Sequence, residues 1–406
     1  MVKACIVGLG SRGHDLIQYL LVMMKDLEIV SVCDVYEDRV EEAKRLLREA
    51  GRTEPIGFTD WKAALNVAGL DACFIFSNWA THTEIALYAM EKGIAVGSEV
   101  GCEYSLENCF NLVKTQERTG TPYMFLENCC YGRDELLATS MARRGLFGTI
   151  VHCSGAYAHD LRNSVAYGRQ KRHYRLDNYL YRNCDNYPTH DLGPIAKLLD
   201  INRGNRILTV SSFASKAAGL YDYIATREDA TDEMRNADFA QGDIINTMIT
   251  CAGGETIQLT LDTTLPRFYD RAFTVRGTKG MYTQTLDSVF LDGDSEELIS
   301  ADYAEKNVHN SKAFEEEYLP AIHKNITKEA IDAGHSGMDW FVYRAFVEAV
   351  KNGTPMPIDV YDGAVWQAVA VLSEESIAKG GAPVAMPDFT GGKWLTRKRL
   401  DVCEMP

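Results

Sequence analysis

Several features that define common classes of protein are absent from this chain of 406 residues. No apolar run approaches the roughly 18 residues of a membrane span, so we expect no membrane partner. No dense run of Lys and Arg is present, and the formal net charge is −15, which argues against nucleic-acid binding. The segment 167–175 does interleave basic and aromatic residues, but in so acidic a chain this favours a solvated or active-site loop over an RNA-binding loop.

Motifs for several kinds of catalysis are also missing. The chain has no H-E-x-x-H and no comparable zinc-ligand spacing, so we expect no metal ion, and it has no G-x-S-x-G motif for a serine hydrolase. Its 11 cysteines are scattered, without a Cys-x-x-Cys pair, although Cys129 and Cys130 are adjacent. Scattered cysteines favour reduced thiols and a cytoplasmic location. The motifs that are present indicate redox chemistry instead.

The length of the chain predicts two domains, because a single core rarely extends over so many residues. We expect an α/β protein, with an N-terminal Rossmann doubly wound parallel sheet at 1–130. A C-terminal α+β domain at 131–361 is expected to contain a large, mostly antiparallel, open-faced sheet. A helix and tail at 362–406 should pack back on the first domain. No low-complexity linker separates the two halves, so the domains should be closely associated.

The strongest local signal is a glycine motif near the N-terminus. Residues 3–7 are typical of a buried strand, and they are followed by Gly8-Leu9-Gly10-Ser11-Arg12-Gly13 and then by a helical apolar stripe. This order is the Rossmann fingerprint, in which the glycines let the backbone approach a pyrophosphate. Asp34 ends the second predicted strand and can bind a ribose diol, which favours NAD over NADP. Arg12 and Arg39 leave a phosphate-binding alternative open.

Strand and helix patterns alternate as far as residue 126, as a doubly wound sheet requires. Ligands of such sheets bind beyond the carboxyl ends of the strands. The segments there are 77–82, 99–100 and 127–128. Trp79 could equally be a hydrophobic plug, and His82 a helix-entry residue.

From residue 149 onward the runs become longer and strand-like. The predicted strands are Val151–Tyr157, Ile207–Ala214, Ile244–Cys251, Thr256–Leu261, Phe273–Arg276 and Met281–Thr285. They favour an antiparallel sheet with one exposed face, which makes a homo-oligomer the expected state.

A tyrosine and a histidine flank a predicted helix entrance in this second half. Pro188 suits the first position of that helix, so Tyr187 and His190 should lie at its N-terminus. The helix dipole there favours a neutral imidazole that can act as a base. We therefore predict that proton transfer takes place at this entrance.

Together these motifs resemble the Gfo/Idh/MocA superfamily of NAD(P)-linked sugar oxidoreductases. Within it, the chain is most similar to the NAD-dependent glycosidases of glycoside hydrolase family 109, named for α-N-acetylgalactosaminidase. The resemblance rests on motifs spread over almost the whole chain. They are 8–13, the W-x-x-H of 79–82, 97–100, 126–131, Tyr187-Pro188-Thr189-His190, 202–204, 334–339 and 359–362. Superfamily dehydrogenases commonly have Glu-Lys-Pro where this chain has Ser98-Glu99-Val100, and the missing lysine favours the glycosidase branch.

The resemblance implies hydrolysis of a glycoside by transient oxidation at C3, elimination, addition of water and re-reduction, with NAD as the cofactor. The cofactor-binding residues that it implies, taken together with the glycine motif, are Gly8, Leu9, Gly10, Ser11, Arg12, Gly13, Asp34, Ser77, Asn78, Trp79, His82, Glu99, Val100 and Asn128. The implied sugar-binding residues are Tyr157, Arg175, Tyr187, Pro188, Thr189, His190 and Tyr269, and we add His335. For catalysis we predict Tyr187 and His190, with Tyr157, His159 and Glu127 as further candidates.

Two alternatives remain at this point. A plain sugar or inositol dehydrogenase of the same superfamily would release reduced cofactor, and a sugar sensor would bind without turnover. The chain also departs from the family pattern beside the central motif, where Cys184, Asp185 and Asp191 stand. These neighbours put a preference for N-acetylgalactosamine in question.

Overall fold

The computed structural model describes residues 1–293 and 308–406. The chain divides into two compact units. The first contains 1–128 and 325–365, and the second contains 129–324 and 366–406. Among the described residues, no helix is both long and apolar enough to cross a membrane.

The first unit contains a six-stranded sheet in which every pairing is parallel. Its strands are β1 (Val2–Val7), β2 (Leu27–Cys33), β3 (Ile56–Phe58), β4 (Ala72–Ile75), β5 (Ala95–Ser98) and β6 (Tyr123–Phe125). Their order in the sheet is β3-β2-β1-β4-β5-β6. This is the order of a dinucleotide-binding sheet, and it confirms the predicted fold class of the N-terminal half.

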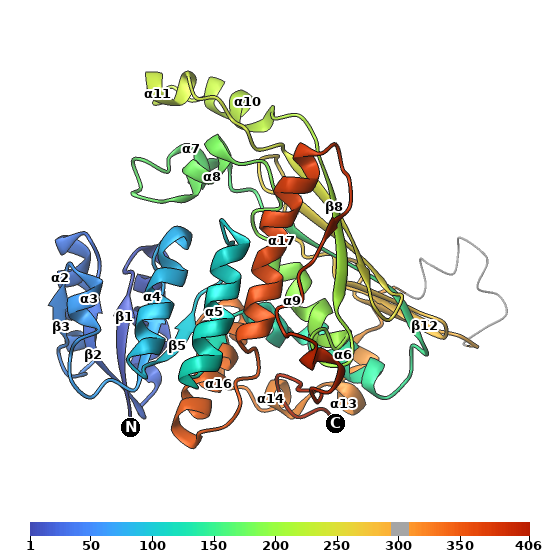
Figure 1. The fold of residues 1–406 in the computed structure, drawn as a ribbon, viewed down its shortest axis with the longest axis horizontal. Helices are drawn as coiled ribbons and strands as arrows, with labels where there is room; N and C mark the ends of the chain where they lie inside the picture. The colour runs from blue at the N-terminus through green and yellow to red at the C-terminus, as the bar shows by residue number, and fades with distance from the viewer. Residues whose placement is uncertain (294–307) are drawn as a thin grey trace. The chain divides into compact units, whose positions relative to one another are not determined.

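Helices connect and cover these strands, as Figure 1 shows for α4 and α5. They are α1 (Ser11–Tyr19), α2 (Glu37–Glu49), α3 (Trp61–Ala64), α4 (Trp79–Glu91), α5 (Leu106–Thr119), α15 (Lys328–Asp332) and α16 (Met338–Asn352). Helix α16 returns to this sheet from far along the chain. A Cβ atom on Gly97 of β5 would lie only 3.2 Å from the ring of Phe346 in α16. The absence of a side chain at Gly97 therefore lets α16 pack closely on the sheet.

The second unit contains an eight-stranded sheet in the order β13-β12-β11-β7-β10-β9-β8-β14. Its strands are β7 (Ile150–Ala158), β8 (Ile207–Ala214), β9 (Ile244–Cys251), β10 (Thr256–Asp262), β11 (Thr274–Gly277), β12 (Gly280–Thr283), β13 (Ser288–Leu291) and β14 (Val384–Ala385). Only the pairing of β7 with β10 is parallel. Strand β9 alternates buried with exposed residues, so this sheet has a packed face and an open face, as predicted.

The helices of the second unit are mostly short. They are α6 (Arg133–Arg143), α7 (Arg162–Ala166), α8 (Arg175–Tyr181), α9 (Thr189–Leu198), α10 (Gly219–Ala225), α11 (Asp232–Arg235), α13 (Lys312–Tyr318) and α14 (Ala321–Lys324). Helix α9 lies directly on β7, because a Cβ atom on Gly155 would be 2.8 Å from the Cβ atom of Asp191. This close packing brings the N-terminal turn of α9 to the end of β7.

The two units differ from the expected boundaries in two respects. Residues 325–365 join the first unit, although we expected them in the second domain. Helix α17 (Val360–Ala378) runs across the boundary at 365, and residues 366–406 belong to the second unit. The physical reason lies in the pairing of β14 with β8, and in a hydrogen bond from the Ser212 amide to the Ser376 hydroxyl.

Candidate active site

The turn between β1 and α1 requires glycine at two positions. Gly8 has a φ of +101°, and a Cβ atom there would lie 2.3 Å from the backbone of Phe76. A Cβ atom on Gly13 would lie 2.3 Å from the carbonyl oxygen of Gly8. The first glycine thus permits the turn and the last permits close packing of helix on strand, which are their roles in a dinucleotide-binding motif.

The face of Gly10 is open by comparison. A Cβ atom there would meet only the Arg39 side chain, at 3.6 Å. Helix α1 begins at the next residue, Ser11, and has no acidic residue in its first turn. A half-buried glycine with open space beside it, before a helix N-terminus without carboxylates, suits an anionic phosphate group.

Asp34 lies beside this turn, at the end of β2. Its carboxylate accepts hydrogen bonds from the amides of Leu9 (2.8 Å) and Tyr36 (3.0 Å). Asp34 and the glycine motif are therefore neighbours at one edge of the sheet, as the fingerprint predicts.

Arg12 and Glu99, both predicted to contact cofactor, bind each other. The Arg12 guanidinium donates to Glu99 at 2.9 and 3.0 Å and to Asp339 at 2.7 and 2.9 Å. The Tyr343 hydroxyl donates to Glu99 at 2.6 Å, and the Asn128 amide donates to Asp339 at 2.7 Å. Burial alone would lower the pKa of Arg12, but the two carboxylates raise it well above its ordinary value. This network links the glycine turn to α16.

His335 projects from a strained loop just before α16. Gly334, His335, Ser336 and Gly337 all have positive φ, with values of 138°, 46°, 55° and 92°. The His335 side chain is 53% exposed, and its Nδ1 lies 2.8 Å from the nearly buried carboxylate of Asp339. A buried carboxylate therefore orients a solvent-accessible imidazole, and strain of this kind is concentrated at functional sites.

The segment 77–82, which follows β4, contains two buried side chains, Trp79 and His82. Asn78 is the N-cap of α4 and is exposed, but Trp79 is buried and packs against Gly101. The Nε2 atom of His82 lies 2.9 Å from the Ser77 carbonyl oxygen, and burial lowers the pKa of this histidine. Trp79 and His82 thus have packing roles, and their assignment to the cofactor stays a prediction. Val100 follows Glu99 and donates its amide to that carboxylate at 3.1 Å.

In the second unit, Tyr157, Tyr187 and His190 form one aromatic cluster. The ring centroids of Tyr157 and Tyr187 are 4.5 Å apart, and those of Tyr187 and His190 are 4.8 Å apart. The Tyr157 and His190 centroids are separated by 5.4 Å. Tyr157 is the penultimate residue of β7, and the other two flank the start of α9, so the end of the strand and the helix entrance bring all three side chains together.

Further predicted residues surround this cluster. The Tyr157 hydroxyl lies 3.3 Å from Nδ1 of His159, whose ring centroid is 5.3 Å from that of Tyr269. The Arg175 guanidinium lies over the Tyr187 ring, 4.8 Å from its centroid. An aromatic wall with tyrosine hydroxyls, imidazoles and a cation is suited to binding and deprotonating a polyhydroxylated ligand.

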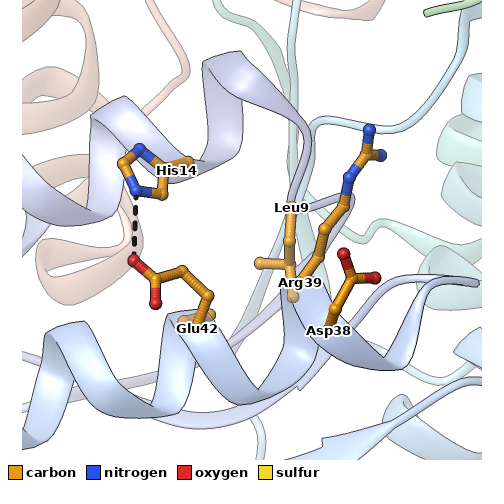
Figure 2. A pocket seen from close by; sticks show the side chains of 6 residues that line it. Leu9, His14, Asp38, Arg39 and Glu42 are labelled. Atoms are coloured by element: carbon orange, nitrogen blue, oxygen red, sulfur yellow. Dashed lines mark ion pairs between the residues drawn. The ribbon is translucent and has the colours of Figure 1, made fainter. Parts of the chain in front are cut away.

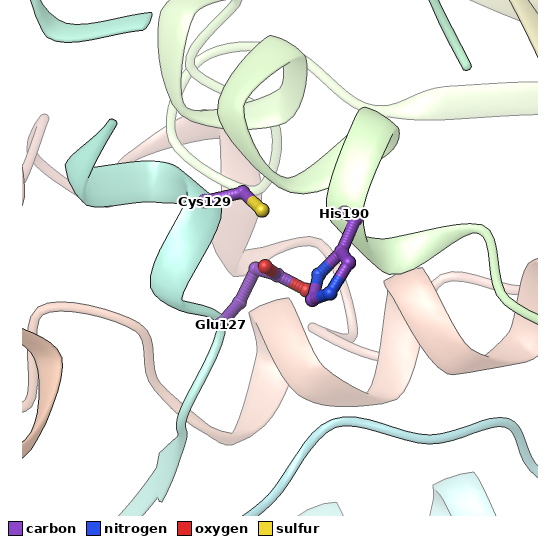
Figure 3. Close-up of side chains that lie close together, drawn as sticks. All are labelled: Glu127, Cys129 and His190. Atoms are coloured by element: carbon purple, nitrogen blue, oxygen red, sulfur yellow. The ribbon is translucent and has the colours of Figure 1, made fainter. Parts of the chain in front are cut away.

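Pro188 and Thr189 have structural positions at this entrance. Pro188 is the N-cap of α9, one residue earlier than its expected place inside the helix, and Thr189 is fully buried. Cys129 also approaches the cluster from the start of the second unit. Its Sγ and a ring nitrogen of His190 lie within 4.8 Å of each other (Figure 3). Glu127, near the end of the first unit, is completely buried.

The residues that depart from the family pattern are buried in the second unit. Cys184, Asp185 and Asp191 are each at most 3% exposed. The Thr247 hydroxyl donates to the Asp185 carboxylate at 3.3 Å, and burial raises the pKa of that carboxyl to about 7. These three side chains are therefore packed inside the second unit, and neither aspartate presents an exposed carboxylate to a sugar.

Asp339 and Tyr343 are functional candidates that sequence reasoning missed. The motif 334–339 drew attention to His335, but no helix was predicted after it. The apolar residues Val342, Phe346 and Ala349 have the i, i+4, i+7 spacing of a buried helix face and could have indicated α16. Local periodicity would still not have shown that this helix reaches Arg12.

The fold and these two clusters define a class of protein. A parallel sheet with a dinucleotide turn, combined with a mostly antiparallel open-faced sheet, is the architecture of the Gfo/Idh/MocA oxidoreductases. Residues 2–126 match the family model "Oxidoreductase family, NAD-binding Rossmann fold". Residues 131–396 match the model "Glycosyl hydrolase 109, C-terminal domain". The chain belongs to glycosyl hydrolase family 109, as its motifs predicted, and is a glycoside hydrolase by family.

Individual relatives agree with this assignment. A glycosyl hydrolase family 109 protein of Stenotrophomonas maltophilia is 38% identical over 98% of this chain and 91% of its own length. An alpha-N-acetylgalactosaminidase of Tannerella forsythia is 34% identical over 98% and 88%. The scyllo-inositol dehydrogenase of Lactobacillus casei, solved with NAD(H) and scyllo-inositol, has a TM-score of 0.65 at 16% identity over 95% and 99%. That last similarity concerns the fold alone.

Proposed function

We propose that this protein is an NAD-dependent glycosidase that cleaves an N-acetylgalactosaminide-like or other hexoside with no net redox change. The observation that carries the proposal is the cluster of Tyr157, Tyr187 and His190 within the family 109 region. Support for the sugar class comes from the Tannerella forsythia relative, which is named an alpha-N-acetylgalactosaminidase.

The residues of the first unit fit a dinucleotide. The open face of Gly10 before α1 suits the pyrophosphate, and the carboxylate of Asp34 suits a ribose diol. When bound, NAD would supply a reversible acceptor for the hydride at C3 of the sugar.

The side chains of the protein would carry out the proton transfers of this reaction. A ketone at C3 acidifies the hydrogen on C2, so a base can remove that proton while the glycosidic oxygen leaves and water then adds. Tyr187 and His190 are the proposed transfer groups, with Tyr157 and His159 as the neighbouring pair and Arg175 holding the Tyr187 ring. The paired carboxylates of ordinary glycosidases are unnecessary in this chemistry.

His335 is a further proposed sugar contact. Asp339 engages its Nδ1, so the half-exposed ring can offer Nε2 to a substrate hydroxyl or leaving group. This is the arrangement by which a carboxylate fixes the tautomer of a catalytic imidazole.

A dehydrogenase is the second candidate, because residues 2–126 match the oxidoreductase family model and the proposed chemistry also begins with oxidation of a sugar. One experiment separates the two. Purified protein is incubated with nitrophenyl α- and β-glycosides without added cofactor, and then with free sugars and excess NAD⁺ while NADH absorbance is followed. Release of nitrophenol without NADH accumulation is expected. NADH formation from free sugars without nitrophenol release would establish the dehydrogenase instead.

A further inference from the structure

The small hollow between α1 and α2 belongs to the proposed dinucleotide site. It has a volume of about 150 Å³, and its lining includes Leu9 of the glycine turn. Oε1 of Glu42 and Nε2 of His14 face each other across it, 3.6 Å apart (Figure 2). Because the Leu9 amide also donates to Asp34, the hollow continues the region that the proposed function assigns to NAD. A buried ion pair in the second unit, by contrast, has no role in that proposal.

The carboxylate of Glu135 and the guanidinium of Arg271 form this pair. Oε1 of Glu135 accepts hydrogen bonds from Nε of Arg271 (2.8 Å) and from the side-chain amide of Gln284 (3.1 Å), and Nη2 of Arg271 lies 2.7 Å from it. The side chains of Glu135 and Arg271 are 2% and 12% exposed. Burying two charges in this way brings little net stability compared with apolar side chains of similar size, so packing alone does not explain the pair.

The start of α6 is shaped to hold the Glu135 carboxylate. Glu135 lies in the first turn of this helix, where the helix dipole favours negative charge. Gly132 is the N-cap, and a Cβ atom there would collide with Oε2 of Glu135. The glycine therefore leaves the space that the carboxylate occupies, and the carboxylate in turn fixes Arg271.

The backbone beside Arg271 runs along the end of β7. Ala158 and Asp270 exchange two hydrogen bonds, of 3.2 Å from the Ala158 amide and 2.9 Å from the Asp270 amide. Tyr269 directly precedes this pairing, and its ring centroid lies 5.3 Å from that of His159. Arg271 and the predicted sugar-binding residue Tyr269 are thus held on one short segment next to the aromatic cluster.

Arg271 is placed to act on Tyr269 rather than on a ligand. Its Cζ lies 6.0 Å from the centroid of the Tyr269 ring, and the guanidinium is nearly buried, whereas Tyr269 is 45% exposed. Partial burial raises the pKa of the Tyr269 hydroxyl, and Arg271 opposes that rise through its charge and a hydrogen bond. A guanidinium can only donate, so the phenol oxygen accepts and its O–H group can point to a sugar hydroxyl.

We propose that Arg271, held by Glu135, is a positioning residue that orients Tyr269 toward the sugar. This inference rests on the proposed function, which places the sugar at the aromatic cluster. It assigns Tyr269 to substrate binding rather than to proton transfer. Loss of Arg271 should therefore weaken binding and leave the chemical step largely unchanged.

A double-mutant cycle tests this coupling on the nitrophenyl glycoside that wild type cleaves fastest. KM and kcat are measured for wild type, Tyr269→Phe, Arg271→Met and Tyr269→Phe/Arg271→Met, with thermal denaturation as the check of folding. Arg276→Met is the matched control, because that arginine is exposed and lies further along the same segment, in β11. Glu135→Gln/Arg271→Met is a second variant if Arg271→Met folds poorly, because it removes both buried charges.

Tyr269→Phe and Arg271→Met are each expected to raise KM about ten-fold, with kcat changed less than about three-fold. Tyr269→Phe/Arg271→Met should show the same rise of about ten-fold rather than about a hundred-fold, because Arg271 acts through the hydroxyl that is already absent. Glu135→Gln/Arg271→Met should match Arg271→Met, and Arg276→Met should match wild type.

The inference is overturned, while the proposed function stands, if Arg271→Met keeps the KM of wild type or lowers kcat instead. It is also overturned if the effects of Tyr269→Phe and Arg271→Met multiply, or if Arg276→Met raises KM as much as Arg271→Met does. If wild type cleaves no glycoside, the proposed function and the inference are both overturned.

Discussion

The imidazole of His335 lies 2.8 Å from the carboxylate of Asp339, which is only 2% exposed. The same carboxylate receives two hydrogen bonds from Arg12 and one from Asn128. Asp339 therefore holds together a proposed sugar contact and the glycine turn. Replacing it with Asn keeps the shape of the side chain and removes the charge that these donors require.

Asp339→Asn is expected to lower the free energy of unfolding at pH 7 by about 1–3 kcal/mol, measured by urea denaturation. The expected loss of stability is modest because the Arg12 side chain is 30% exposed and keeps its bonds to Glu99. Lys351→Ala, which removes a more exposed ion pair with Asp26, is a suitable control and should change stability by less than about 1 kcal/mol. Equal effects of the two changes would mean that the network contributes no more than a surface pair.

The difference in free energy of unfolding between wild type and Asp339→Asn should depend on pH in a defined direction. Burial would raise the pKa of Asp339, but Arg12 and His335 together lower it below its usual range. A lowered folded-state pKa stabilises the protein above the unfolded-state value of about 3.9, and this stabilisation is lost as the pH falls below it. The gap between wild type and Asp339→Asn should therefore shrink between pH 5 and pH 3, as measured by denaturation at each pH.

Local patterns predicted much of the fold but not how distant segments meet. Strands β8 and β9 coincide with their predicted bounds, because alternating apolar residues and flanking turns are local signals. The pairing of Arg12 with Asp339 joins residues 327 positions apart, and no periodicity encodes it. The two-residue strand β14 likewise acquires its identity only from pairing with β8. Tertiary contacts decide such features, and they also decided where the units divide.

The candidate site was likewise predictable from local sequence only in part. The glycine turn and Asp34 were predictable because the chemistry of a dinucleotide requires those residue types at a fixed spacing. The sequence also grouped Tyr187 with His190, since both flank one helix entrance. The burial of Asp185 could not be predicted, because an aspartate beside a site is usually exposed, and only the packing of Thr247 against it shows otherwise.

Tyr187→Phe tests the proton-transfer role with little change in packing. The ring would keep its contacts with Tyr157 and Arg175, so bound NAD and thermal stability should be retained. Loss of the hydroxyl is expected to lower kcat by about 10²–10⁴-fold on a nitrophenyl glycoside. Tyr167→Phe, which removes a hydroxyl bonded to Asp229 on the surface, is the control and should leave kcat unchanged. Full activity of Tyr187→Phe would show that this residue transfers no proton.

Gly8→Ala and Gly10→Ala should separate folding from cofactor binding. A methyl group on Gly8 would collide with the backbone at 2.3 Å, so we expect a loss of about 3 kcal/mol or more, or no folded protein. A methyl group on Gly10 meets only Arg39 at 3.6 Å, so the fold should survive while the retained dinucleotide is lost. Gly51→Ala is the control, since its positive φ carries a cost but its surroundings are open. Retention of NAD by Gly10→Ala would place the pyrophosphate elsewhere.

The contribution of Asp185 to stability should change with pH in the opposite direction to that of Asp339. Burial raises the pKa of its carboxyl to about 7, although the Thr247 hydroxyl opposes this shift. A raised folded-state pKa favours folding below the unfolded-state value of about 3.9, and this advantage is lost as the pH rises through 7. Above pH 7 the protein must therefore hold a buried, ionised carboxylate that an amide would not require.

Asp185→Asn should accordingly be more stable than wild type at pH 8, by about 1–3 kcal/mol, and equally stable near pH 4. Denaturation by urea at pH 4, 6 and 8 measures the trend, with Asp222→Asn on the exposed face of α10 as the control for loss of a charge. The amide can still accept the Thr247 hydrogen bond, so a stabilisation that grows with pH isolates the cost of the buried charge. A variant less stable than wild type at pH 8 would instead show that the ionised carboxylate is a favourable partner for its neighbours, and that the fold around Tyr187 depends on it.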